Sequence, residues 1–260
     1  MTNRVLYKIG GVYMAKVIGI GNESFQEIRE NDCFYIDKTS FIKEWWENDD
    51  TVTLITRPRR FGKTLNLNML ECFFSNKYKD RGDLFDGLDI WKEGQYRELQ
   101  GTYPVIFISF AKIKQNNYTD TIAGIKRIIC DVIQKYYFLK DWQGLTDEEK
   151  NNLKSITYGM DDLTAQEAIA SISNYLSRYY GKKVIILLDE YDTPMQEAYV
   201  NGYWEELVAF TRSFFNATFK TNPYLERAIM TGITRVSKES IFSDLNNLEV
   251  ITTLSPKYET

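Results

Sequence analysis

The sequence predicts an α/β fold with a mostly parallel central sheet. Residues 105–108 and 184–188 are short, continuous apolar runs, which is the pattern of strands buried on both faces. Between them, apolar residues from 122 to 136 recur at helical spacing and predict a long helix. Strand-like and helix-like segments alternate along the chain, as they do when helices connect parallel strands.

The first elements expected along the chain are short. A capping-box pattern at residues 24–27 predicts a short helix, and the apolar run at 33–36 predicts a strand. A second short helix is expected over 41–46, with Thr39 or Ser40 available as its N-terminal cap. These segments precede the strand that leads into the first candidate functional motif.

That strand is the β-branched run 51–56, and a helix is expected from Lys63 to about residue 74. Residues 75–103 are expected to be irregular, and residues 139–162 to be a charged connector. Two further helices and two further strands complete the expected alternation of helices and strands. A capping box at 164–167 predicts a helix that Gly181 ends, a helix follows over 203–214, and two more strands are expected at 228–231 and 248–254.

Composition restricts the chemistry that this chain can perform. Its 260 residues carry a formal net charge of -4, which argues against a surface that binds nucleic acid by charge alone. The sequence contains no His, so His-based zinc sites and Ser/His nucleophiles are excluded. Cys33, Cys72 and Cys130 are isolated and are expected to be buried thiols. We find no membrane-spanning run or signal-peptide pattern, and expect a cytoplasmic protein with no membrane partner.

Residues 57–64 form the pattern of a phosphate-binding loop. Such a loop points backbone N–H groups at phosphate oxygens and needs a Gly where the chain comes closest, here Gly62. Lys63 supplies a positive charge for the β- and γ-phosphates, and the Thr64 hydroxyl supplies a ligand for Mg²⁺. Arg57 occupies the position of the first Gly of the general pattern, so the match is incomplete. The alternative is a tight strand-to-helix turn with surface basic residues.

An acidic pair ends the second buried run. Because strand-end loops of a parallel sheet lie at one edge, Asp189 and Glu190 are expected to face the loop. Asp189 would hold Mg²⁺ directly or through water, and Glu190 would orient and deprotonate the attacking water. The alternative for both is a solvated strand end or a helix cap. Asp192 either belongs to this site or caps the next helix.

Several arginines supply further positive charge, with alternatives that stay open. Pro58 fixes its own φ and pushes Arg57 toward an extended backbone. Arg59 and Arg60 face either the phosphates or a partner such as nucleic acid. Arg235 is the candidate within this chain for an arginine finger, or else an ordinary surface residue.

Four motifs together resemble the bacterial AAA-ATPase-like family, and the likeness extends from Ile18 to the C-terminus. They are residues 35–39, 56–64, 187–194 and 231–236. The resemblance implies a P-loop NTPase three-layer sandwich with a mostly parallel central sheet and an additional strand between the two nucleotide motifs. The run at 105–108 looks like that strand.

The same resemblance implies a domain organisation. We expect an N-terminal extension over 1–17 and an AAA-ATPase-like P-loop domain over 18–260. Members of the family typically carry a PD-(D/E)XK nuclease-like domain after the ATPase region, and this sequence lacks it. The chain is therefore expected to be a fragment, a truncated product or a stand-alone ATPase module.

By resemblance, the loop's departure from the general pattern is the family's own version of it. Tyr35 and Asp37 are implied to lie near the base or sugar, and Thr231 with Arg235 to sense the γ-phosphate. The implied catalytic residues are Glu190, Lys63 and Arg235, and the implied metal ligands are Thr64 and Asp189. The implied nucleotide-binding set is Arg57, Pro58, Arg59, Arg60, Phe61, Gly62, Lys63, Thr64, Leu65, Tyr35, Asp37 and Thr231.

The function expected is binding of ATP with Mg²⁺ and its hydrolysis. One alternative is a regulatory module that binds nucleotide without turnover. Another is the ATPase part of a nucleic-acid-processing or defence protein, with a nucleic-acid or protein partner reached through the C-terminal region outside this chain. Phosphorylation of a small molecule would need an acceptor pocket that the sequence does not indicate. Oligomeric state stays open.

Overall fold

Five strands form an all-parallel sheet in the computed structural model, which describes residues 4–9, 12–19, 21–234, 242, 245–252 and 255. Their order across the sheet is β4-β5-β6-β3-β7. The strands are β3 (Val52–Thr56), β4 (Val105–Ser109), β5 (Val184–Asp189), β6 (Leu225–Gly232) and β7 (Leu248–Ile251). With helices flanking this sheet, the predicted α/β fold is confirmed and is consistent with a P-loop NTPase.

The chain divides into two compact units. The first unit contains the described residues up to Asp49 together with Gly62–Thr102, and the second contains Asp50–Phe61 and the described residues from Tyr103 onward. The five-stranded sheet belongs entirely to the second unit, which we call the sheet unit. The bond between Phe61 and Gly62 therefore carries the chain from the sheet unit into the first unit, within the predicted phosphate-binding loop.

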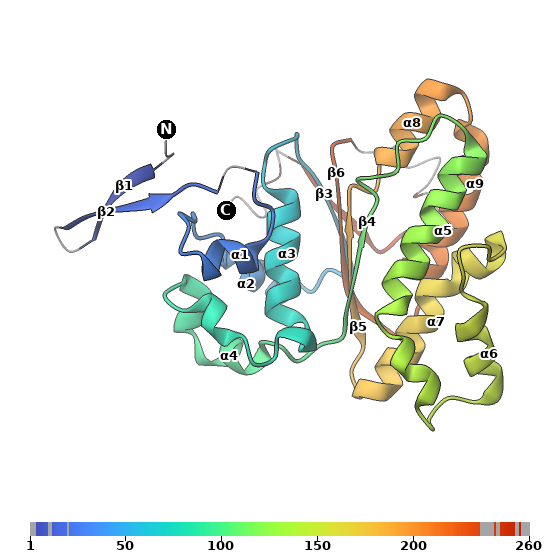
Figure 1. Ribbon diagram of the computed structural model, residues 1–260, viewed down its shortest axis with the longest axis horizontal. Coiled ribbons are helices and arrows are strands. Elements are labelled where there is room, and N and C mark those ends of the chain that lie inside the picture. Colours follow the sequence, from blue (N-terminus) through green and yellow to red (C-terminus); the bar gives the residue numbers. More distant parts are fainter. Residues whose placement is uncertain are drawn as a thin grey trace. The chain divides into compact units, whose positions relative to one another are not determined.

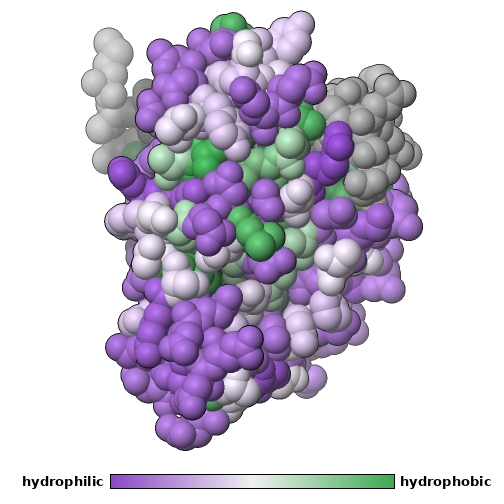
Figure 2. Space-filling view, turned by 90° about the vertical axis from the view of Figure 1, so that its right-hand side faces the viewer, coloured by the Kyte–Doolittle hydropathy of each residue, from purple (hydrophilic) through white to green (hydrophobic). Residues whose placement is uncertain are grey.

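Three long helices lie on one side of the sheet within the sheet unit (Figure 1). They are α5 (Tyr118–Gln134), α7 (Asp162–Tyr180) and α9 (Trp204–Phe215). Each presents an apolar stripe to a common core, represented by the fully buried Ile129, Ile172 and Leu207. Figure 2, which faces this side of the molecule, shows a mostly hydrophilic surface in which hydrophobic residues are scattered. The apolar faces are therefore turned inward.

Two predictions for the sheet unit are wrong in detail. The connector expected over 139–162 contains a helix, α6 (Asp147–Ser155), which a capping box of Thr146 and Glu149 opens. α7 begins earlier than the pattern at 164–167 indicates, because the Asp161 carboxylate accepts a hydrogen bond from the N–H of Thr164. The sequence did not indicate α6, because this helix is so highly charged that it lacks an apolar stripe.

The remaining elements of the sheet unit are η4 (Tyr137–Asp141), α8 (Thr193–Asn201) and η5 (Asn216–Lys220).

The first unit consists of short elements. An antiparallel hairpin of β1 (Arg4–Ile9) and β2 (Val12–Val17) opens it. The helices are α1 (Phe25–Glu30), α2 (Ser40–Asn48), α3 (Lys63–Phe74), α4 (Gly94–Leu99), η1 (Asn76–Tyr78), η2 (Gly82–Phe85) and η3 (Asp89–Lys92). The strand predicted at 33–36 is wrong, because this segment lies in no strand. Its Tyr35 ring packs edge-on against Phe25 instead, with centroids 5.4 Å apart.

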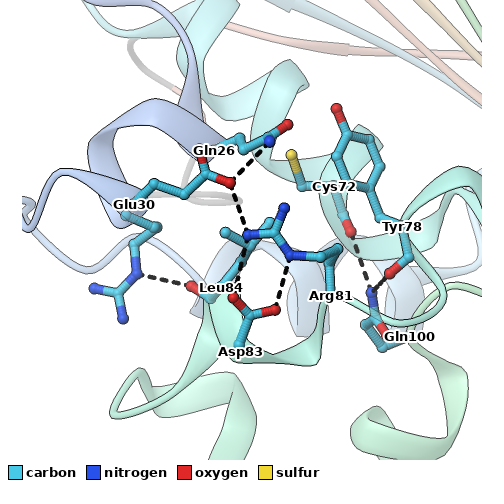
Figure 3. A network of polar contacts seen from close by, with 9 residues as sticks. Gln26, Glu30, Cys72, Tyr78, Arg81, Asp83, Leu84 and Gln100 are labelled. Atoms are coloured by element: carbon cyan, nitrogen blue, oxygen red, sulfur yellow. Dashed lines mark hydrogen bonds and ion pairs between the residues drawn. The ribbon is translucent and has the colours of Figure 1, made fainter.

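Polar contacts between side chains and backbone connect these short helices (Figure 3). The Arg81 guanidinium donates to the Glu30 carboxylate at 2.8 Å and to the Asp83 carboxylate at 3.0 Å. Hydrogen bonds from Gln26 and Arg81 lower the pKa of Glu30, and the hydrogen bond from Arg81 lowers that of Asp83. Gln100 donates to the carbonyl of Tyr78 at 2.7 Å. The segment 75–103, expected to be irregular, is thus ordered by specific hydrogen bonds.

The position of β6 decides which strand ends become neighbours. Along the chain, β4 lies between the loop after β3 and the acidic pair after β5, as expected of the additional strand. Within the sheet, however, β4 is at the edge beyond β5, and β6 is the strand that lies between β3 and β5. The end of β6 is therefore next to both motifs of the sheet unit.

Candidate functional site

The carboxyl ends of β3, β6 and β5 lie side by side at one edge of the sheet, because the three strands are parallel and adjacent. Thr56, the last residue of β3, is in register with Gly232, the last residue of β6. The N–H of Arg57 donates to the Gly232 carbonyl at 3.2 Å. The start of the predicted phosphate-binding loop is thus tied to the end of β6.

The backbone of the loop explains its unusual sequence. Gly62 has φ +73 and forms the N-terminal cap of α3, a left-handed conformation that Gly adopts without strain. Arg60 also has a positive φ, of +70, whereas Arg57 does not. Because Arg57 continues the extended pairing of β3, its position requires no Gly. The absence of a Gly at this position therefore causes no strain from a left-handed backbone.

Lys63, Thr64 and Leu65 form the first turn of α3, in the first unit. The N–H of Asn66 donates to the Gly62 carbonyl at 2.9 Å, so the helical hydrogen bonds begin there. The helix dipole makes the N-terminus of α3 favourable for an anion. The loop residues Arg59, Arg60 and Phe61, in the sheet unit, are exposed.

Asp189 is the last residue of β5, and only 2% of its surface is exposed. Its carboxylate Oδ1 accepts a hydrogen bond from the Thr231 hydroxyl of β6 at 2.5 Å. A hydrogen bond to an ionised acceptor is short and strong, so it orients the carboxylate. The structure therefore brings together two of the predicted residues, Asp189 and Thr231.

Glu190 follows with a strained backbone. Its φ is +54, a value that costs a residue with a β-carbon about 1–2 kcal/mol. Its N–H points at the Thr231 hydroxyl at 3.4 Å, and its carboxylate accepts a hydrogen bond from the Thr193 hydroxyl at 3.1 Å. Strain of this kind concentrates at functional sites, where surrounding contacts maintain it.

Asp192 is fully buried and binds the segment after β6. Its Oδ2 accepts hydrogen bonds from the N–H of Ile233 at 3.0 Å and from the N–H and hydroxyl of Thr234, both at 2.8 Å. Asp192 precedes α8, but its carboxylate makes no capping hydrogen bond to that helix. Asp192 therefore occupies the N-cap position of α8, as one of the two alternatives predicts, but its carboxylate binds the segment after β6 instead of capping the helix backbone. Sequence reasoning missed Ile233 and Thr234, for which no local pattern signals a long-range contact.

The two residues implied to lie near the base or sugar belong to the first unit. Tyr35 donates from its hydroxyl to the Met69 sulfur at 3.2 Å, and burial raises the pKa of that hydroxyl. Asp37 accepts hydrogen bonds from the N–H and hydroxyl of Thr39 at 2.9 and 2.7 Å, and from the N–H of Asp89 at 2.7 Å. Both residues support the segment before α2. Arg235 lies outside the described residues.

Carboxylate and hydroxyl oxygens are hard donors, which suit Mg²⁺ better than a softer metal. Among the described residues, no cluster of three or more His, Cys, Asp or Glu side chains could hold a metal by itself. Mg²⁺ does not need such a cluster, because it is commonly bound by one or two carboxylates, water and substrate phosphates. Asp189, buried in the sheet unit, carries a carboxylate, and Thr64, in the first unit, carries a hydroxyl; each is an oxygen donor. A search of the described helices for a membrane-crossing segment finds none that is sufficiently long and apolar.

Comparison with known proteins agrees with the motifs. A family model described as "Predicted AAA-ATPase", of the AAA-ATPase-like family, matches residues 19–242. A protein of Azotobacter chroococcum mcd 1, described as an uncharacterized protein in the vnfD 5′ region, is 28% identical over 239 residues. The match covers 91% of this chain but 41% of that protein, so the chain spans about two-fifths of the length of this relative. No solved structure matches.

Proposed function

The chain belongs to the predicted AAA-ATPase family, and from this premise we propose that it binds ATP with Mg²⁺ and hydrolyses the γ-phosphate. One observation carries the proposal. A loop leaves the carboxyl end of parallel strand β3 and continues through the left-handed Gly62 directly into α3, which begins with Lys63 and Thr64. This strand, loop and helix sequence is the arrangement that places N–H groups, a Lys and a hydroxyl around phosphates.

In the proposed site, Lys63 pairs with the β- and γ-phosphates, and the N–H groups at the start of α3 bind phosphate oxygens. The Thr64 hydroxyl and Asp189 hold Mg²⁺, which neutralises charge on the phosphates when it is bound. Thr231 orients the Asp189 carboxylate through its hydroxyl. As at other metal sites, a partner that orients a ligand adjusts metal affinity without contacting the metal.

Glu190 is the proposed general base for the attacking water. The chain has no His, and a carboxylate is the natural candidate for this role. Glu190 immediately follows the proposed metal ligand, and its backbone and side chain are held by Thr231 and Thr193. This support fixes the carboxylate relative to Asp189, as water activation next to a metal requires.

The test measures ATP affinity and phosphate release with and without Mg²⁺, and with GTP in place of ATP. Lys63→Ala should weaken ATP binding, with Lys154→Ala on the exposed side of α6 as the matched control. Glu190→Gln should retain ATP binding but lower phosphate release by about 10²–10⁴-fold. Glu205→Gln, an exposed carboxylate on α9, is its control and should match wild type.

Three results would reject parts of the proposal. ATP affinity unchanged in Lys63→Ala would reject the loop as the phosphate site. Phosphate release unchanged in Glu190→Gln would reject the assigned base. Tight Mg²⁺-dependent ATP binding with no release under any condition would reject hydrolysis and favour a regulatory nucleotide-binding module.

A further inference from the structure

Asp192 connects three elements of the sheet unit at the proposed site. It follows β5 and precedes α8, and its Oδ2 accepts two N–H groups and one hydroxyl from Ile233 and Thr234, beyond the end of β6. The same oxygen accepts a hydrogen bond from the Gln196 amide of α8 at 2.8 Å. The other carboxylate oxygen, Oδ1, is buried and has no hydrogen-bond partner among the described residues. All of these hydrogen bonds from α8 and from the segment after β6 are therefore accepted by one atom, Oδ2 of Asp192.

This contact is the last in a series that joins residues 189–192 to residues 231–234. The N–H of Tyr191 donates to the Thr231 carbonyl at 2.9 Å, and the Tyr191 hydroxyl donates to the Thr234 carbonyl at 2.8 Å. The series begins at the hydrogen bond between Thr231 and Asp189. The two segments are therefore connected along their whole length.

Gly232 shows how close the two segments are. A β-carbon at this position would lie 2.6 Å from the Tyr191 ring and 2.7 Å from Oδ1 of Asp192, distances that real β-carbons essentially never show. Gly232 has no need of a left-handed backbone, so its lack of a side chain serves this close approach. A larger residue would push the two segments apart at the level of the Asp192 carboxylate.

We propose that Asp192 is a positioning residue for metal binding. Its carboxylate holds residues 231–234 against residues 189–192, and this keeps the Thr231 hydroxyl on Asp189. The orientation of the Asp189 carboxylate then depends on a buried carboxylate three residues further along the chain. This inference rests on the proposed function, because it takes Asp189 as the Mg²⁺ ligand.

The test compares Asp192→Asn with Gln196→Ala. Asp192→Asn removes the negative charge that binds the segment after β6, whereas Gln196→Ala removes only the contact to α8. For Asp192→Asn we expect the Mg²⁺ concentration for half-maximal ATP turnover to rise by about 10–100-fold, as for other partners of metal ligands. ATP affinity without Mg²⁺ should stay within twofold of wild type. Gln196→Ala should match wild type in both measurements.

A second readout does not depend on turnover. Amide hydrogen exchange at Ile233 and Thr234 should accelerate in Asp192→Asn and remain slow in Gln196→Ala, because only the first variant weakens the acceptor of those two N–H groups. Gly232→Ala should reproduce the Mg²⁺ effect by separating the same segments. If Gly232→Ala loses its cooperative thermal transition, the exchange measurement in Asp192→Asn decides the question; if Asp192→Asn loses it, the Mg²⁺ requirement of Gly232→Ala decides it.

The outcomes separate this proposal from the proposed function. If wild type neither binds nor turns over ATP in a Mg²⁺-dependent way, the proposed function fails, and the exchange data still report on the Asp192 contacts. If wild type does so and Asp192→Asn has the wild-type Mg²⁺ requirement, the positioning role is rejected. Equal effects of Asp192→Asn and Gln196→Ala would also reject it, since they would show that Asp192 acts by packing α8.

Discussion

The sheet unit and the first unit use polar side chains differently. In the sheet unit, backbone pairing between parallel strands organises the core, all six residues of β5 are buried, and Asp189 and Asp192 are grouped at the strand ends. In the first unit, polar side chains such as Arg81 and Asp37 bind loops and short helices together. Polar side chains make structural hydrogen bonds in both units, but those of the sheet unit gather where parallel strands end, whereas those of the first unit are spread over loops and short helices.

The largest expected effect is a core truncation in the sheet unit. Ile186 is fully buried on β5, in register with Ile106 on one side and Ala228 on the other. Ile186→Ala should lower the free energy of unfolding by about 2–5 kcal/mol, through lost burial and the cavity that remains. Denaturant unfolding measures this loss, and Ile186→Val, expected to cost about 0.5–1.5 kcal/mol, is the graded control. A loss for Ile186→Ala no larger than that for Ile186→Val would contradict the assigned core position.

A polar residue of the first unit should have the next largest effect. Asp37→Ala removes three hydrogen bonds to a carboxylate and should lower the free energy of unfolding by about 1–3 kcal/mol. Chemical denaturation measures the loss, and ATP affinity measured on the same variant sharpens the comparison. A drop in affinity of more than about tenfold, near 1.4 kcal/mol, would support the nucleotide contact that the sequence predicts for Asp37. Stability equal to wild type would contradict its structural role.

A smaller, pH-dependent effect is expected from the ion pair of Arg178 and Glu149 in the sheet unit. The hydrogen bond from Arg178 lowers the pKa of Glu149, so the stabilisation is present above the ordinary Glu pKa and disappears as the pH falls through the lowered value. Arg178→Met should therefore cost about 0.5 kcal/mol more at pH 7 than at a pH where Glu149 is protonated, because the hydrogen bond from Arg178 to the Gly144 carbonyl is lost at either pH.

The control for this ion pair comes from the first unit. Lys92 and Asp89 form an ion pair in which the side chains are 73% and 65% exposed. Lys92→Met should leave the thermal midpoint unchanged at either pH, because solvent screens so exposed a pair. If Arg178→Met has the same effect at pH 7 as at a pH low enough to protonate Glu149, Arg178 acts by packing over the Trp142 ring and by its hydrogen bond to the Gly144 carbonyl rather than by its charge.

The difference between the two units also explains what the sequence could predict. The strands at 105–108 and 184–188 are recognisable because burial on both faces requires unbroken apolar runs. The end of α7 is recognisable because Gly181 adopts the left-handed conformation that stops a helix. Where a single local requirement determines the residue type, prediction from the sequence is reliable.

The remaining features depend on partners distant in the chain. The apolar residues at 33–36 satisfy a strand pattern, yet the segment forms no strand: the Tyr35 ring packs on Phe25, and the N–H of Phe34 donates to the carbonyl of Val17 at the end of β2. Asp192 has the local pattern of a helix cap, yet its acceptor oxygen binds Ile233 and Thr234, more than forty positions away. The importance of β6 follows only from strand order, which places it between β3 and β5. No local spacing encodes such contacts.

The left-handed backbone of Glu190 implies that folding stability and the proposed activity make opposite demands on the residue at this position. Its strain, about 1–2 kcal/mol, exceeds the roughly 0.5–1 kcal/mol that Gly loses through its greater freedom in the unfolded chain. Glu190→Gly should therefore raise the thermal midpoint slightly while removing the proposed base, and Glu190→Gln should leave the midpoint unchanged. On stability alone Gly would be the better residue at this position, so the carboxylate at position 190 comes at a cost in folding free energy.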